Sequence, residues 1–150
     1  GFATTPEAYE KAFTALFDTL DMIEQRLSSQ TYLVGDTITE ADWRLFTTLV
    51  RFDSVYVGHF KCNKKRIVDY PNLWTYVRRL YHYPAVKSAQ VKSTQVKDTV
   101  NMAHIKRHYY YSHETINPTR IVPVGPEIDW RLPDDREQLC SNTNTQTSAA

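Results

Sequence analysis

The stretch at residues 35–56, GDTITEADWRLFTTLVRFDSVY, contains the sharpest helix start in the sequence and decides the fold. Gly35 and Asp36 form a turn. Thr39 then occupies the position of an N-cap, and Asp42 follows three residues later. In a capping box the Thr39 hydroxyl accepts from the Asp42 backbone N–H, and the Asp42 carboxylate accepts from the Thr39 N–H. We therefore interpret Thr39 and Asp42 as a structural cap rather than as a catalytic pair.

The helix that begins here is apolar on more than one side. Its apolar positions are Trp43, Leu45, Phe46, Leu49, Val50 and Phe52. A helix that is apolar nearly all round is surrounded by other helices, so we predict that this is the central helix of the fold. Arg51 and Asp53 flank its last apolar residue, and we interpret them as a buried or half-buried ion pair. Neither half of the stretch is expected to touch the chemistry.

Further helices are predicted on both sides of the central one. Residues 4–7, Thr-Thr-Pro-Glu, supply a hydroxyl cap, a Pro at the first helical position and an acid in the first turn. Apolar residues then recur at three- and four-residue steps: Tyr9, Phe13, Leu16, Phe17, Leu20, Ile23 and Leu27. Beyond the central helix, residues 70–72 begin another helix that ends at 82–84, and residues 101–117 contain a short one. We find no convincing strand pair, so the pattern predicts an all-α bundle.

Two segments depart from helical periodicity. Residues 90–99 are a tandem duplication, QVKST followed by QVKDT. A period of five fits neither helix nor strand, which favours a solvated insertion. Residues 119–132 are extended and proline-broken, and we assign them as the irregular end of one helical domain at 1–132. Residues 133–150 are acidic and then rich in Ser, Thr, Asn and Gln, which predicts a disordered tail.

Composition excludes several classes of function. With 150 residues and 41% apolar content the chain can bury one real core, and its net charge of +1 gives no electrostatic argument for nucleic acid. No run approaches the roughly 20 apolar residues of a membrane span. We therefore predict neither a nucleic-acid nor a membrane partner. Cys62 and Cys140 form no disulfide framework and no paired metal spacing, which favours a reducing, cytoplasmic compartment.

The histidines suggest a metal site and a group of basic residues suggests a phosphate site, but each pattern has a simpler structural explanation. His104 and His108 lie one helical turn apart, which is metal-ligand spacing, and His113 follows. No Glu or cysteine pair accompanies them, so we favour surface or hydrogen-bonded histidines and predict no metal. A basic cluster consists of Lys61, Lys64, Lys65 and Arg66. Because the whole chain is almost neutral, we interpret this cluster as an exposed connector rather than as a phosphate site.

At this point the residue pattern resembles a known family. Residues 35–42, Gly-Asp-x-Ile-Thr-x-Ala-Asp, resemble the capping motif of the C-terminal helical domain of cytosolic glutathione transferases. More specific blocks resemble the glutathionyl-hydroquinone reductases, also called xi-class or omega-like transferases. These blocks lie at 45–53, 55–56, 59–62, 104–110, 112–113 and 115–118. The resemblance covers roughly residues 1–130.

The resemblance implies an enzyme of which this chain is the second half. In that family a thioredoxin-like domain with a nucleophilic cysteine in a Cys-Pro motif precedes the helical domain. Neither cysteine here fits the motif, because Cys62 is followed by Asn63 and Cys140 by Ser141. The chain also lacks an initiator Met. We therefore expect a fragment that is inactive by itself with glutathione.

The chemistry that the resemblance implies is thiol-dependent. The cysteine thiolate of the missing domain attacks the sulfur of a glutathionyl-hydroquinone, and a second glutathione resolves the mixed disulfide. Glutathione is thus the co-substrate, bound mainly by the missing domain, while the helical half supplies a hydroquinone-binding wall and a homodimer contact. By motif match Tyr109 is the substrate-binding residue, with His108 and Tyr110 as secondary candidates. A buried core tyrosine with a satisfied hydroxyl is the alternative for Tyr109.

Two other functions are compatible with the sequence. The first is a glutathione transferase that conjugates electrophiles and has a Ser or Tyr in place of the cysteine. The second is a non-catalytic, transferase-like assembly module of the kind found in translation complexes. The sequence upstream of residue 1 decides the first alternative, and co-purification with such a complex favours the second. The duplication at 90–99, shortly before Tyr109, also departs from the family pattern.

Overall fold

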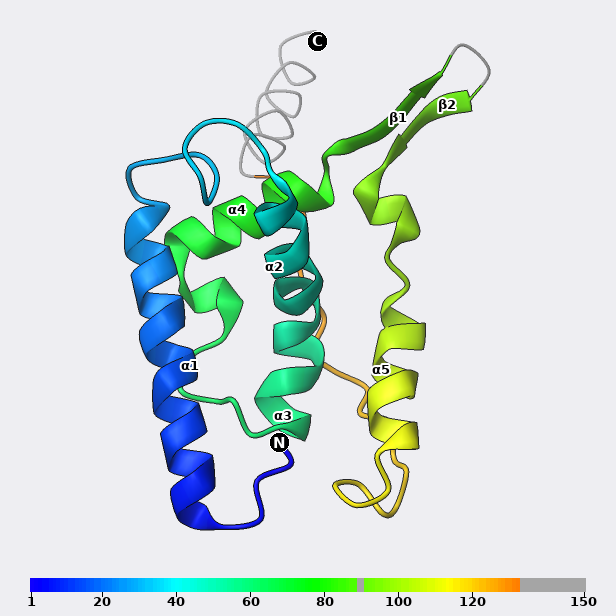
Figure 1. Ribbon diagram of the computed structural model, residues 1–150. Coiled ribbons are helices and arrows are strands. Elements are labelled where there is room, and N and C mark those ends of the chain that lie inside the picture. Colours follow the sequence, from blue (N-terminus) through cyan, green and yellow to red (C-terminus); the bar gives the residue numbers. More distant parts are fainter. Residues whose placement is uncertain (89–90, 133–150) are drawn as a thin grey trace, which may run out of the picture.

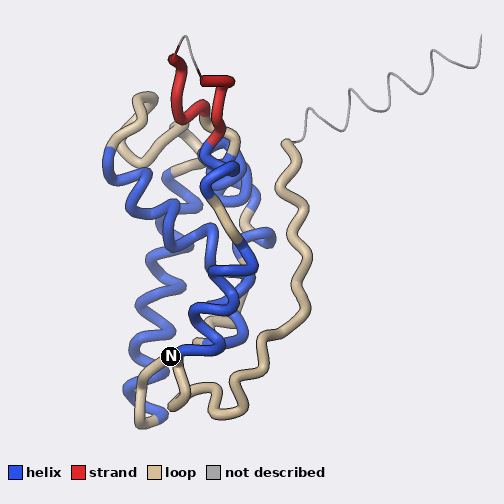
Figure 2. The backbone as a smooth tube through the Cα atoms, turned by 90° about the vertical axis from the view of Figure 1, so that its right-hand side faces the viewer, coloured by secondary structure: helices blue, strands red, loops and turns tan. Residues whose placement is uncertain are grey.

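The computed structural model describes residues 1–88 and 91–132, and within them the chain is mostly helical (Figures 1 and 2). The helical elements are α1 (Pro6–Arg26), α2 (Glu40–Arg51), the π-helical turn η1 (Phe52–Tyr56), α3 (Val57–His59), the 3-10 turn η2 (Ile67–Asp69), α4 (Pro71–Tyr81), the 3-10 turn η3 (Val96–Thr99) and α5 (Met102–Ser112). The predicted all-α bundle is confirmed. The predicted tail at 133–150 lies outside the described residues.

The central helix is a continuous rod made of α2, η1 and α3. It lies between α1 on one side and α5 on the other, and α4 packs across its first half (Figure 1). The core is formed where α1, the rod and α4 meet, and its largest apolar members are Phe17, Leu20, Phe46, Leu49, Val50, Phe52, Ile67, Tyr70, Leu73, Tyr76, Val77 and Leu80. In the described ranges, 1–88 and 91–132, we find no helix that is both long and apolar enough to cross a membrane.

The start of α1 has its predicted cap, whereas the start of α4 is capped by a residue of α1. The Thr5 hydroxyl accepts from the Ala8 N–H at 3.2 Å, directly before Pro6. Helix α4 has no such cap of its own at residue 70. Its first N–H groups instead donate to the Glu24 carboxylate of α1, from Asn72 at 2.9 Å and from Leu73 at 2.7 Å. Since a carboxylate is favourable at a helix N-terminus, Glu24 ties α1 to α4.

The capping box at the start of α2 is present and belongs to a larger network. The Asp42 carboxylate accepts from the Thr39 N–H at 2.7 Å and from the Thr39 hydroxyl at 2.9 Å. Its other oxygen accepts from the Leu33 N–H and from the Tyr76 hydroxyl, both at 2.9 Å. Burial acts to raise the pKa of Asp42, but these hydrogen bonds outweigh it and hold the pKa below its ordinary value. One fully buried carboxylate therefore joins the turn, α2 and α4.

The prediction that Arg51 and Asp53 form an ion pair is wrong. The Asp53 carboxylate accepts from two backbone N–H groups of η2, Ile67 at 2.6 Å and Val68 at 3.1 Å. The Arg51 guanidinium donates to the backbone carbonyl of Thr47, in its own helix. Burial raises the pKa of Asp53, although the two N–H groups act to lower it. The carboxylate thus caps a turn that is distant in sequence, where the first-turn N–H groups need an acceptor.

The expected absence of a strand pair is also wrong in one place. Strands β1 (Pro84–Ser88) and β2 (Val91–Gln95) form a short antiparallel hairpin. The second copy of the duplication differs from the first in conformation, because it forms η3. Asp98 of that copy, where the first copy has Ser93, accepts from the Gln95 N–H at 2.8 Å. A carboxylate in this position caps a helical turn, which explains why two nearly identical pentapeptides adopt different structures.

The segment at 119–132 is irregular, as predicted, and packs along the helices (Figure 2). The Trp130 ring stacks on Tyr81 with centroids 4.5 Å apart, and the Trp130 carbonyl lies 2.9 Å from His82 Nε2. Further back in the segment, the Lys106 ammonium of α5 donates to the carbonyls of Val124 at 2.7 Å and Gly125 at 2.9 Å. The segment therefore contacts both α4 and α5.

Candidate functional site

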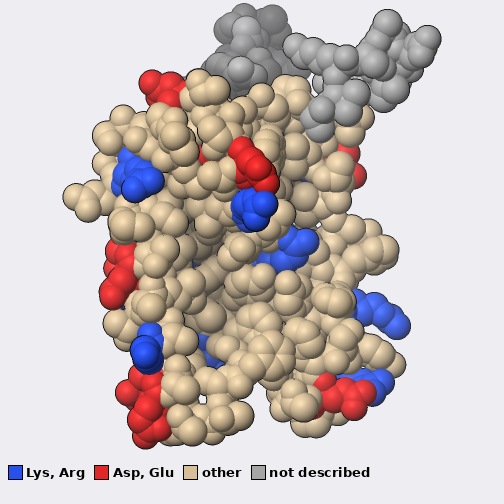
Figure 3. Space-filling model, in the orientation of Figure 1, with Lys and Arg blue, Asp and Glu red and all other residues tan. Residues whose placement is uncertain are grey.

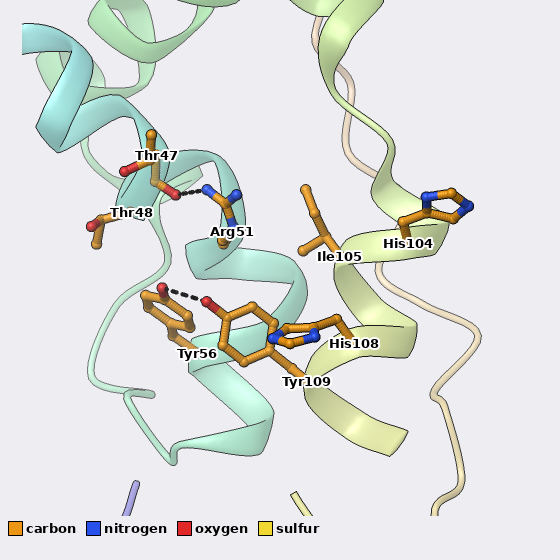
Figure 4. A pocket seen from close by; sticks show the side chains of 8 residues that line it. All are labelled: Thr47, Thr48, Arg51, Tyr56, His104, Ile105, His108 and Tyr109. Carbon is orange, nitrogen blue, oxygen red and sulfur yellow. Dashed lines mark hydrogen bonds between the residues drawn. The ribbon is translucent and has the colours of Figure 1, made fainter. Parts of the chain in front are cut away.

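A cavity of about 420 Å³ lies between the central rod and α5 (Figure 4). The rod contributes Thr47, Thr48, Arg51 and Tyr56 to its lining, and α5 contributes His104, Ile105, His108 and Tyr109. A second cavity of about 360 Å³ adjoins the first and shares with it Thr47, Arg51, His104 and Ile105. The two cavities together form one groove between these elements, which we call the α2–α5 groove.

The π-helical turn explains how Tyr56 reaches the cavity. In this turn the Val57 N–H donates to the carbonyl of Phe52, five residues back rather than four. An ordinary α-helical repeat places residue 54 or 55 on the face of Arg51, and both of these residues are buried. Because the wide turn accommodates one more residue, Tyr56 rather than residue 55 follows Arg51 on the wall of the groove.

A pair of phenols forms one end of the cavity. The hydroxyls of Tyr56 and Tyr109 lie 3.2 Å apart, and their rings pack edge to face with centroids 5.7 Å apart. Phe60 packs against both rings, at centroid distances of 5.2 Å and 5.8 Å. Burial and the hydrogen bond to Tyr109 raise the pKa of Tyr56 above its ordinary value. The Tyr56 phenol is therefore protonated at neutral pH and can donate to Tyr109 or to a ligand.

The three site residues expected from the sequence do not share one environment. Tyr109 and His108 line the cavity, whereas Tyr110 is not part of the lining. Its ring packs on that of buried His59, with centroids 4.6 Å apart. Consecutive helical residues point about 100° apart, so neighbours in α5 necessarily face different surroundings. Tyr109 is partly buried and its hydroxyl meets Tyr56 at the cavity, so it is not a fully enclosed core residue. The substrate-binding roles stay predictions.

The sequence did not indicate the contribution of the central helix. We expected that stretch to organise the fold without touching the site, yet Thr47, Thr48, Arg51 and Tyr56 line the same cavity as Tyr109. Apolar periodicity does not reveal a π-helical turn, so the resemblance of residues 55–56 to the family did not show that Tyr56 faces the cavity. Arg51 did stand out in the sequence, because it is a charged residue near the end of a largely apolar helix.

The histidines divide between the groove and the packing beneath it. His104 and His108 line the cavity, whereas His113 Nδ1 lies 3.0 Å from the Nε2 of buried His59. Within the part of the chain that the structure describes, no group of three or more His, Cys, Asp or Glu side chains is arranged to hold a metal ion. Charged side chains of both signs are scattered over the face shown in Figure 3, rather than gathered in a patch of one sign.

The His59–His113 pair predicts a dependence of stability on pH. Burial lowers the pKa of His59, and the charges of His113 and Lys61 lower it further. The unfolded chain therefore binds this proton more readily, so the contribution of His59 to stability is present above about pH 6.5 and is lost as the pH falls towards the lower folded value. Between pH 7.5 and 5.5 we expect the free energy of unfolding in urea to fall by roughly 1 kcal/mol, the value of one hydrogen bond.

Matched variants separate this effect from general acid sensitivity. His59→Gln is expected to lose most of the pH dependence, whereas exposed His104→Gln keeps it. Equal pH dependence in both variants would show that His59 is not responsible.

Comparisons with known proteins agree on one family. The sequence matches the family described as glutathione S-transferase, C-terminal domain, over residues 6–79. It is 56% identical over 126 residues to the glutathionyl-hydroquinone reductase PcpF of Sphingobium chlorophenolicum, an alignment that covers 84% of this chain and 37% of PcpF. It is 48% identical over 137 residues to the glutathionyl-hydroquinone reductase YqjG of Escherichia coli, covering 91% of this chain and 39% of YqjG.

Solved structures give the same relationship. The glutathione-bound structure of YqjG superposes with a TM-score of 0.80 and covers 91% of this chain and 41% of that one. The xi-class glutathione transferase of Phanerochaete chrysosporium is 53% identical, with a TM-score of 0.77, and covers 89% of this chain and 40% of that one. The chain thus spans about two fifths of the length of the relatives it matches.

Proposed function

Because this chain is a glutathione-transferase C-terminal helical domain of the kind found in the glutathionyl-hydroquinone reductases, we propose that it forms the hydroquinone-binding half of such an enzyme. The enzyme would reduce glutathionyl-hydroquinones to hydroquinones with glutathione. The observation that carries the proposal is the pair of phenols, Tyr56 and Tyr109, at the end of the α2–α5 groove. We assign the nucleophilic cysteine and most of the glutathione site to a thioredoxin-like domain outside this chain.

In this proposal the helical domain binds and orients the aromatic ring. The ring packs against Tyr109, whose phenol bonds a hydroquinone oxygen, and Tyr56 holds that phenol by its own hydroxyl. The cysteine thiolate attacks the glutathionyl sulfur, and the carbon–sulfur bond breaks. For this step the ring is in its keto tautomer, with a proton on the carbon that carries sulfur, so the electron pair of the broken bond passes through the ring to the ketone oxygen. That oxygen takes up one proton, and the product leaves as hydroquinone. The thiolate of a second glutathione then attacks the glutathionyl sulfur of the mixed disulfide and displaces the enzyme cysteine, giving glutathione disulfide and the free enzyme thiolate.

A chimeric enzyme tests the proposal. The C-terminal segment of PcpF that aligns with this chain is replaced by this chain, since the two are 56% identical. We expect the chimera to convert a neutral glutathionyl-hydroquinone to the hydroquinone with glutathione. The 150-residue chain alone should be inactive, because neither of its cysteines lies in a Cys-Pro motif. A folded chimera that conjugates glutathione to electrophiles but leaves glutathionyl-hydroquinones unchanged would instead support the alternative transferase.

A homodimer and a cytoplasmic location are further parts of the proposal. Several large apolar side chains are exposed in the described residues, including Val34 at 65%, Ile121 at 67% and Val124 at 99%. Exposed apolar surface of this kind is available for a second copy of the chain. Burial raises the pKa of the Cys62 thiol, which is consistent with an unreactive thiol in a reducing compartment. A single species at twice the monomer mass in sedimentation would support the dimer.

A further inference from the structure

Arg51 is a cation that lines both cavities of the groove. Its guanidinium donates to the backbone carbonyl of Thr47. Among the residues that the structure describes, no Asp or Glu forms a salt bridge with it. Arg44, about two turns earlier on the same helix, shows the contrast, because its guanidinium lies 2.7 Å from the Glu40 carboxylate. A guanidinium presents its donors in a fork that matches a carboxylate, and one carbonyl does not satisfy them.

The lining of the groove is suited to an anion. Among the residues described in the structure, no Asp or Glu lines either cavity, and Arg51 belongs to both. Thr47 and Thr48 line the same wall (Figure 4), but the Thr47 hydroxyl donates to the backbone carbonyl of Arg44 at 2.8 Å, so the guanidinium is the main donor on this wall. Since the only charged group that is always ionised here is a guanidinium, the groove favours a negatively charged group at this point.

The position of Arg51 also restricts the kind of ligand. On one side of it are the phenols of Tyr56 and Tyr109, and its charge is near enough to affect the pKa of Tyr56, after the larger effects of burial and of Tyr109. On the other side the second cavity is lined by the apolar side chains of Phe46, Val50 and Val100. A ligand that fits this order has an aromatic ring at the phenols and an anionic group at the guanidinium.

We propose that Arg51 is an anion subsite that binds a carboxylate of the ligand whose ring lies at Tyr56 and Tyr109. The carboxylate belongs either to a substituent of the hydroquinone ring or to the glutathionyl group. For the position of the ring, this inference rests on the proposed function. It adds to that function a preference for substrates whose carboxylate reaches the centre of the groove.

Binding to the 150-residue chain tests the subsite directly. Three probes are titrated under anaerobic conditions by calorimetry or by NMR: (2,5-dihydroxyphenyl)acetate, its methyl ester, and glutathione. The ester keeps the ring and removes the charge, whereas glutathione has carboxylates and no ring. Each probe is measured with the wild-type chain, with Arg51→Met and with Arg51→Lys. Arg44→Met is the matched control, because it removes the same charge from the same helix outside the groove.

The expected result is a loss of about tenfold in affinity for at least one carboxylate probe in Arg51→Met, since charge-assisted bidentate pairs are strong. Arg51→Lys should recover part of it, and Arg44→Met should change nothing. Binding of the ester should be equal in all variants. If Arg51→Met loses affinity for (2,5-dihydroxyphenyl)acetate, the carboxylate belongs to a substituent of the ring. If it loses affinity for glutathione, the carboxylate belongs to the glutathionyl group.

The inference is overturned if Arg51→Met binds both carboxylate probes as tightly as the wild type does, or if neither carboxylate probe binds to the wild type. Neither result decides the proposed function, which depends on activity of the PcpF chimera with a neutral glutathionyl-hydroquinone. Conversely, an inactive chimera combined with Arg51-dependent binding would support the anion subsite and contradict the proposed reaction.

Discussion

Tyr109→Phe in the PcpF chimera is expected to lower kcat/KM for a glutathionyl-hydroquinone by about 100-fold, at the lower end of what a positioned proton donor contributes. The substitution keeps the ring, which packs on Tyr56 and Phe60, and removes only the hydroxyl at the cavity. Charge develops on the hydroquinone oxygen as the carbon–sulfur bond breaks. The hydrogen bond is then stronger in the transition state than in the bound substrate, so we expect the loss mainly in kcat.

Tyr111→Phe is the matched control for this measurement. Tyr111 is 42% exposed, contacts the guanidinium groups of Arg107 and Arg120, and does not line the cavity. Its variant should keep kcat/KM within about twofold of the parent chimera, and equal melting temperatures would show that both variants fold alike. A Tyr109→Phe enzyme with unchanged kcat would contradict the assignment of the phenol to the reaction.

Asp42→Ala is expected to destabilise the chain by about 3–4 kcal/mol, more than the 1–2 kcal/mol of an N-cap alone. The carboxylate is fully buried and accepts four hydrogen bonds, from the N–H and hydroxyl of Thr39, the N–H of Leu33 and the hydroxyl of Tyr76. Removing it leaves the Leu33 N–H and the Tyr76 hydroxyl without an acceptor, and buried donors of this kind are costly.

Urea denaturation measures this effect, and Glu40→Ala is the control. Glu40 also lies in the first turn of α2, but its side chain is 78% exposed and pairs only with Arg44, so its loss should cost under about 0.5 kcal/mol. A free-energy change of 1–2 kcal/mol for Asp42→Ala would indicate that only the cap matters. The pKa of Asp42 is lowered in the fold, so its stabilisation is present above about pH 4 and is lost as the pH falls through the folded value.

Local signals in the sequence predicted much of the fold. The starts of α1 and α2 follow from Thr5, Pro6, Thr39 and Asp42, whose capping geometry depends on residues only a few positions apart. The partners of Asp53 were missed for the opposite reason. Its carboxylate caps a turn that begins fourteen residues later, and a sequence of isolated charges does not show which distant N–H groups are buried.

The site was predictable only in part for a similar reason. Motif resemblance indicated Tyr109, which lines the cavity, whereas the block that contains Tyr56 served only to identify the family and gave that residue no role at the site. A period of 3.6 residues places residue 54 or 55 on the face of Arg51, and only the π-helical turn replaces them with Tyr56. The hairpin of β1 and β2 was missed because β2 lies in a repeat of period five, whose second copy forms η3 instead of a strand.

The two walls of the α2–α5 groove differ in how freely they can change during evolution. Helix α5 has no fully buried residue, whereas the opposite wall belongs to a rod whose other faces form the core. Substitutions in α5 therefore alter the groove at little cost in stability, while most substitutions in the rod disturb packing as well. The residues of α5 that face the groove can therefore both contact a ligand and be substituted with little loss of stability. We expect homologues with different substrate ranges to have diverged first at its groove-facing positions, such as residues 104, 105 and 108.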